Sequence, residues 1–279
     1  GEAYRLLTTA TGDWEKAPPL AAESAGWHVP NSPGVSMYTH LGVSAWFVGD
    51  SSIEDYFALA GELASTQAFP TNAFSRCYLL GYQGWILTEE GRLDDALDAY
   101  GEMAGLGDQH GFDFWTITAL IHMGVVTART LLAGSDPDPQ ELTTAAEELA
   151  GVTALWTSLN TRAFEPYPRT WHAALLAAAD ADGADEAFTD AFALMDTLGL
   201  DFYRAEALRL QARFSGRSDL LRRALEVGEE QEALPFVLRA ALDIARADHD
   251  LEPLRLVADR MPRTATYPEL ALAAALLAG

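Results

Sequence analysis

The sequence predicts an all-α fold, namely a solenoid of about seven antiparallel helix pairs. Apolar residues recur every three or four positions along almost the whole chain, which is the period of one face of a helix. No run of alternating Val, Ile or Thr is bounded by an Asn-Gly or Asp-Gly turn, so strands are not expected. Short breakers recur at intervals of roughly 33 to 49 residues, which is the period of helix-pair repeats.

The clearest helical stripe lies in the segment 93–104. Its apolar positions are three or four residues apart, and its acidic positions fall on the other side of the same helix. The apolar positions are Leu93, Ala96, Leu97, Tyr100, Met103 and Ala104, and the acidic ones are Asp94, Asp95, Asp98 and Glu102.

Most of the breakers contain glycine, which can end one helix in a left-handed conformation, and a polar neighbour can cap the next helix. The breakers are Gly12-Asp13, Gly49-Asp50, Gly91-Arg92, Gly134-Ser135, Asp182-Gly183, Gly216-Arg217 and Asp248-His249. They predict helix pairs over 2–27, 34–67, 71–109, 112–159, 168–198, 200–232 and 235–261, with a closing helix from about 266.

One helix pair cannot bury its apolar stripe alone, so neighbouring pairs are expected to stack and share a core. The regular intervals and the absence of an evident linker predict a single helical-repeat domain over residues 1–279. The segment 160–170, which contains Pro166 and Pro168, is the best candidate for a kink or a boundary between two sub-arrays.

Composition excludes several classes of function. The net charge of -23 opposes binding to nucleic acid or to an anionic membrane surface. Cys77 is the only cysteine, which excludes an intrachain disulfide and a thiolate zinc cluster and fits a cytoplasmic location. The most apolar long stretch, Thr118 to Gly134, contains His122 and Arg129 and is too short and too polar to span a bilayer.

The sequence lacks the usual signatures of catalysis and of metal binding. The segment Gly42-Val43-Ser44-Ala45-Trp46 lacks the second glycine of a nucleophile elbow. The histidine pairs His28/His40 and His110/His122 lack the spacing of metal ligands on a helix. The sequence therefore predicts no catalytic residue, no metal and no cofactor.

Four segments resemble the tetratricopeptide regions of bacterial multidomain signalling ATPases, which include LuxR-type regulators and class III nucleotide cyclase proteins. The segments are Gly84–Arg92, His110–Trp115, Phe202–Leu210, and Leu221–Val227 followed by Leu238–Arg246. In such repeats, two small residues let the paired helices approach, and Gly84 and Ala96 match them, with Tyr100 at the large packing position. The resemblance implies a right-handed superhelix. It does not extend to the ATPase, because no Gly-x-x-x-x-Gly-Lys-Ser/Thr loop is present.

The candidate binding residues lie on predicted first helices, which line the concave groove of such a solenoid. They are Tyr78, Tyr82, Trp85, Trp115, His122, Arg169 and His172. Aromatic rings with a polar tip suit a binding surface, and arginine in an acidic chain can recognise a carboxylate or phosphate. Each has a plainer alternative, in which the aromatics and histidines form core and the arginine pairs with a local acid.

The sequence thus predicts a non-catalytic domain that binds a peptide, a small effector or a partner domain in its concave groove. The resemblance implies that it regulates a signalling or transcription-control protein. One alternative is a purely structural or oligomerising scaffold, for example a homodimer. A second alternative is an enzyme with an acidic site in the groove, since a fold alone does not exclude catalysis.

Overall fold

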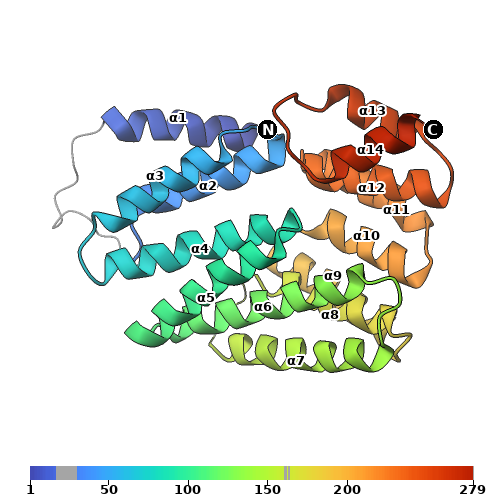
Figure 1. Cartoon of the computed structure of the whole chain (residues 1–279), viewed down its shortest axis with the longest axis horizontal. Coiled ribbons are helices and arrows are strands. Elements are labelled where there is room, and N and C mark those ends of the chain that lie inside the picture. The colour runs from blue at the N-terminus through green and yellow to red at the C-terminus, as the bar shows by residue number, and fades with distance from the viewer. Residues whose placement is uncertain (17–29, 160–161, 163, 279) are drawn as a thin grey trace. The chain divides into compact units, whose positions relative to one another are not determined.

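The computed structural model describes residues 1–16, 30–159, 162 and 164–278, and within these residues it contains fourteen helices and no strand (Figure 1). The helices are α1 (Glu2–Lys16), α2 (Pro33–Val48), α3 (Ile53–Ser65), α4 (Thr71–Glu89), α5 (Leu93–His110), α6 (Asp113–Ala133), α7 (Pro139–Ser158), α8 (Pro166–Ala178), α9 (Ala184–Leu198), α10 (Arg204–Ser215), α11 (Asp219–Glu230), α12 (Leu234–Ala247), α13 (Glu252–Arg260) and α14 (Glu269–Ala278). The prediction of an all-α fold is confirmed.

Some of the predicted Gly-containing breakers end a helix and others do not. At Gly49 the backbone is left-handed, with φ 71°, and its N–H donates to the carbonyls that end α2. Gly12-Asp13 was predicted to end a helix and does not, because α1 runs through both residues. A single glycine costs a helix only about 1 kcal/mol, which the rest of α1 can offset. The second half of the predicted pair 2–27 lies outside the described residues.

The chain divides into two compact units, Gly1–Thr116 (unit 1) and Ile117–Gly279 (unit 2). The prediction of one repeat domain over residues 1–279, with a kink or boundary near 160–170, stays a prediction.

In unit 1, helices that follow one another pack together, and alternate helices also touch. Helix α2 contacts α1, α3 and α4, and α4 contacts α3 and α5 (Figure 1). The largest fully buried side chains include Trp46 on α2, Leu79 and Leu80 on α4, and Tyr100 on α5. These residues belong to the apolar core of unit 1.

Two glycines in unit 1 allow an aromatic ring to lie directly on a helix backbone. A Cβ at Gly84 would lie 2.6 Å from Cε1 of Tyr100, and one at Gly42 would lie 2.7 Å from Cε1 of Phe57. Real Cβ atoms do not approach a ring so closely, and Tyr100 is fully buried. Glycine is therefore needed at both positions for the observed helix separation.

Replacing Gly84 by Ala is expected to destabilise the chain by a net of about 1–2 kcal/mol, because overpacking against Tyr100 exceeds the gain in helix propensity. The matched control is Gly101→Ala on α5, where an added Cβ meets nothing within 4 Å. That variant is expected to be neutral or stabilised. Urea denaturation of the two variants beside the original chain measures both changes, and equal effects at the two glycines would contradict the close-packing argument.

Unit 2 follows a similar pattern of neighbour contacts. Helix α8 contacts α7, α9 and α10, helix α12 contacts α10, α11, α13 and α14, and α10 contacts α11. Its centre holds an aromatic column in which the rings of Tyr167 and Tyr203 are 4.8 Å apart and those of Tyr203 and Phe236 are 5.6 Å apart, both edge to face. Edge-to-face packing adds to the stability gained from burying the rings.

Helix α6 is the one described helix that is long and apolar enough, by length and composition alone, to cross a membrane. Its most apolar window has a mean hydropathy of 1.4, and half of that window is buried in the structure. A buried core helix passes the same test, so α6 is weak evidence for a membrane span, and the expectation of no membrane stays a prediction.

Candidate binding site

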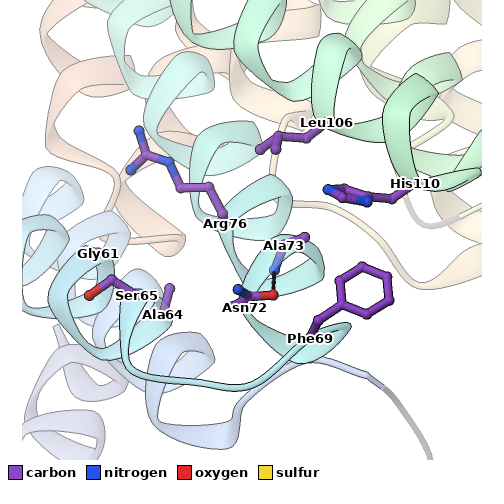
Figure 2. A pocket seen from close by; sticks show the side chains of 9 residues that line it. All are labelled: Gly61, Ala64, Ser65, Phe69, Asn72, Ala73, Arg76, Leu106 and His110. Carbon is purple, nitrogen blue, oxygen red and sulfur yellow. Dashed lines mark hydrogen bonds between the residues drawn. The ribbon is translucent and has the colours of Figure 1, made fainter.

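A pocket of about 390 Å³ opens in unit 1 where α3, α4 and α5 meet (Figure 2). It is lined by Gly61, Ala64, Ser65, Phe69, Asn72, Ala73, Arg76, Leu106 and His110. The volume lies within the range of pockets that hold small ligands or anchoring side chains.

Helical spacing explains how these residues come to share one pocket. Asn72 and Ala73 lie about one turn before Arg76 on α4, and Leu106 lies one turn before His110 on α5. The third wall comes from the last turns of α3. The pocket is therefore built from the ends of three helices and the short loop before α4.

Arg76 supplies the strongest polar group of the pocket. Its Nε and Nη2 donate to the two carboxylate oxygens of Glu102 at 2.7 and 2.9 Å, which is a bidentate pair. The hydrogen bonds that Arg76 donates to Glu102 raise the pKa of Arg76, so the guanidinium stays charged. A Cβ built on Gly61 would lie 3.9 Å from Nη1, so this nitrogen lies against the glycine wall of the pocket.

Two smaller polar groups line the same pocket. The carboxamide oxygen of Asn72 accepts from the backbone N–H of Ala73 at 2.7 Å, an interaction drawn in Figure 2. The hydroxyl of Ser65 donates to the carbonyl of Glu62 at 2.7 Å and keeps its capacity to accept. These groups can orient a ligand that carries its own donors and acceptors.

The other side of the pocket is apolar and aromatic. Phe69 is 62% exposed, which is unusual for so large an apolar side chain, and its ring centroid lies 5.1 Å from that of His110. In Figure 2 these rings lie on one side of the pocket and the guanidinium of Arg76 on the other. A ligand group could pack against the exposed face of Phe69.

A chain of aromatic contacts leads from this rim into unit 1 and reaches three of the predicted residues. His110 contacts Phe112, whose ring is 5.5 Å from that of Phe74, and Phe74 is 5.2 Å from Trp115. The chain continues from Trp115 to Tyr78 at 6.1 Å and from Tyr78 to Tyr82 at 5.0 Å.

Tyr78 and Tyr82 lie on the other side of α4 from the pocket. They follow Arg76 by two and six residues, and at about 100° per residue both point roughly away from it. Both rings contact His40 of α2, and the hydroxyl of Tyr78 is 3.3 Å from Nδ1 of His40. Burial raises the pKa of both phenols, so they act as neutral hydrogen-bonding groups.

The two predicted tryptophans of unit 1 are almost fully buried. Trp85 is 7% exposed and packs against Trp46 and Phe47, and Trp115 is 6% exposed. This degree of burial is what the core alternative expects of them. None of Tyr78, Tyr82, Trp85 and Trp115 lines the pocket.

The remaining predicted residues belong to unit 2. His122 is 5% exposed and packs against Tyr167, and burial lowers its pKa to about 4. Arg169 donates from Nε and Nη2 to the buried carboxylate of Glu165, as the alternative of pairing with a local acid expects. His172 is half-buried, and burial together with the charge of Arg169 lowers its pKa.

Unit 2 also contains a buried set of charges that the sequence did not reveal, here called the Glu206 cluster. Arg209 holds Glu206 in a bidentate pair at 2.7 and 2.9 Å and reaches Asp243 at 2.6 Å. Arg239 lies 3.5 Å from Glu206 and donates to Glu269 at 2.6 Å. Burial alone would raise the pKa of Glu206, but the arginine charges outweigh it and lower that pKa to about 2.

Two side chains of types that can act in nucleophilic or acid–base catalysis, Cys77 and Glu165, have shifted pKa values. Burial raises the pKa of the Cys77 thiol to about 12, which suppresses the reactive thiolate. The pKa of Glu165 is lowered, since the hydrogen bonds of Arg162 and Arg169 outweigh the opposing effect of burial. Over the described residues, no three His, Cys, Asp or Glu side chains are grouped as a metal ion requires.

Sequence reasoning did not identify the pocket residues as a site. Phe69 and Asn72 stand beside Pro70 in a loop and at a helix start, where helical periodicity carries no information. The one available signal was the presence of Arg76 on one expected helix and of an acid, Glu102, 26 residues later on the next. Such a pair can be recognised only when the register of the two helices is known.

No protein-family model, no curated protein and no solved structure matches the chain. The resemblance to the tetratricopeptide regions of signalling ATPases stays a prediction, and the function is inferred from the geometry of the site.

Proposed function

We propose that this chain is a non-catalytic helical-repeat domain that binds a peptide, a partner domain or a small effector and thereby regulates a larger signalling protein. The observation that carries the proposal is the open pocket of unit 1, with an aromatic wall at Phe69 and His110 and a charged donor at Arg76. A few polar groups in a mainly apolar concavity are typical of ligand sites.

Two further observations support the solenoid that this proposal assumes. Alternate helices contact one another within each unit, as first helices of stacked pairs do: α2 with α4 in unit 1, and α8 with α10 and α10 with α12 in unit 2. A glycine on one helix faces a large side chain of the next helix in successive pairs, at Gly42, Gly84 and Gly124. The repeated use of the same close approach is expected of a degenerate repeat.

The test fills the pocket without disturbing the backbone. Gly61 lies on α3, where a Cβ would be 3.6 Å from Leu79, an ordinary contact, so Gly61→Leu should fold and project its side chain into the pocket. The matched control is Gly151→Leu on α7 in unit 2, where an added Cβ meets nothing within 4 Å. Thermal melting followed by circular dichroism checks that both variants fold.

Binding is read in two assays. Native mass spectrometry compared with the denatured mass detects a retained small molecule, and selection from a random peptide library detects peptide binding. We expect a ligand that the original chain and Gly151→Leu hold and that Gly61→Leu does not. The proposal fails if neither assay yields a ligand, or if Gly61→Leu binds it as tightly as the original chain.

The alternative of a purely structural scaffold is favoured by the burial of Trp85 and Trp115 and by the pairing of Arg169 with Glu165. A scaffold would keep these contacts and bind nothing in the pocket. The same two assays therefore separate the two functions.

A further inference from the structure

We infer that the pocket of unit 1 receives an apolar or aromatic side chain presented by a basic segment of a partner protein. The inference rests on the proposed function and specifies the chemistry of the partner. It is carried by the charge distribution around the pocket together with the exposed aromatic wall inside it.

The charge of unit 1 is strongly one-sided. Residues 1–116 contain sixteen acidic residues and only four basic ones. Three of the basic residues are already ion-paired, Arg5 with Glu2, Arg76 with Glu102, and Arg92 with Asp95. A partner that approaches this unit therefore meets a negative potential, which attracts cations and repels anions.

Acidic side chains also lie on the helices that form the pocket. Glu62 is adjacent to the lining residue Gly61 on α3 and is exposed. On α5, Asp98 lies about two turns and Glu102 about one turn before the lining residue Leu106, and both are exposed. Asp108 and Asp113, also exposed, stand on either side of His110 in the sequence. The pocket is thus set among carboxylates and holds one cation, Arg76.

Arg76 does not oppose a basic partner. Its charge is balanced by the bidentate pair with Glu102, and its Nη1, on the glycine side of the pocket, can donate to an uncharged acceptor. A backbone carbonyl beside an anchoring residue is such an acceptor. The guanidinium would then fix the orientation of the segment, and the carboxylates around it would pair with flanking Lys or Arg.

The interior of the pocket determines what the anchor must be. The ring of Phe69 is 62% exposed, and Leu106 and Ala64 add apolar surface. Burying an apolar or aromatic side chain there would remove this surface from water, and single anchors of this kind carry much of the affinity of protein interfaces. A hydrophilic or anionic group would not bury this apolar surface favourably.

The test uses short fluorescent peptides of equal length whose binding is followed by anisotropy. One peptide carries a central Trp flanked by Lys, a second carries the same Trp flanked by Glu, and a third has Ala in place of Trp between the Lys residues. We expect the Lys-flanked Trp peptide to bind at least about tenfold more tightly than either of the others, and its affinity to fall as salt is raised.

Two variants and their controls locate the effect. Gly61→Leu should abolish binding and Gly151→Leu should not. Charge reversal of Glu62 and Asp98 to Lys should weaken binding of the Lys-flanked Trp peptide about tenfold or more, whereas the same reversal of Glu147 and Glu148 on α7 should leave it within about twofold. All four acids are exposed, so these substitutions should leave folding intact.

The inference is overturned if the Glu-flanked peptide binds as tightly as the Lys-flanked one, or if the Ala peptide does. In those cases the proposed function would still stand if the original chain bound some other ligand and Gly61→Leu did not bind it. If instead no peptide and no small molecule binds the original chain, the proposed function itself fails.

Discussion

Replacing Glu206 by Gln is expected to destabilise unit 2 by about 3–5 kcal/mol, because the change leaves two arginines in the core without their shared counter-charge. Glu206 is 1% exposed, and Arg209 and Arg239 are 8% and 5% exposed. Asp243 and Glu269 each hold only one of the two guanidinium groups. Urea denaturation followed by circular dichroism measures the change.

The control is an ion pair of the same kind at the surface. Glu226→Gln on α11 removes the exposed partner of Arg223, three residues away, and is expected to cost less than about 0.5 kcal/mol. If Glu206→Gln cost as little as Glu226→Gln, water would have to reach the Glu206 cluster, and its description as a buried network would be wrong.

Acidification is expected to cost the chain roughly 3 kcal/mol of stability through His122 alone. In the folded chain the pKa of His122 is about 4, whereas an unperturbed imidazole has a pKa of about 6.5. Between these values the unfolded chain binds a proton that the folded chain does not. The stability that neutral His122 provides is therefore complete above about pH 6.5 and is lost progressively down to about pH 4.

The measurement compares the pH dependence of the unfolding free energy with that of a His122→Leu variant. The variant should lose less stability over this window, whatever its stability at neutral pH. His249→Asn is the control, because His249 is exposed and Asn tolerates its positive φ of 56°. Parallel curves for the original chain and His122→Leu would show that His122 does not titrate as an isolated buried group. Glu206 contributes only at lower pH, because its pKa falls from its ordinary value to about 2.

The helices could be predicted from the sequence because helical periodicity is a local property. The exact positions at which the helices end could not be predicted, as two Gly-Asp dipeptides show. Gly49-Asp50 ends α2, whereas Gly12-Asp13 continues α1. The chain turns at Gly49 between α2 and α3, and Phe57 of α3 packs directly on Gly42 of α2. That packing, and not the dipeptide, favours the break.

The site was less predictable for a similar reason. Tyr78, Tyr82, Trp85 and Trp115 are predicted because aromatic residues gather on the expected first helices. Only Tyr78, Tyr82 and Trp115 belong to the aromatic chain that begins at the pocket rim. The pocket itself depends on Phe69 in a loop and on how the last turns of α3 and α5 are placed beside the first turns of α4. Neither feature repeats along the sequence, so periodicity could not reveal them.

Because Cys77 is buried, the reactivity of its thiol can report local opening of the structure. Its thiol has 0% exposed surface and lies on α4, with Sγ 3.9 Å from the carbonyl of Met103 on α5. An alkylating reagent can therefore reach the sulfur only while these two helices are apart, and the alkylation rate reflects the population of that open state. No second thiol competes for the reagent, so transient separation within unit 1 can be followed without an engineered label, and a ligand held between α3, α4 and α5 would slow the reaction.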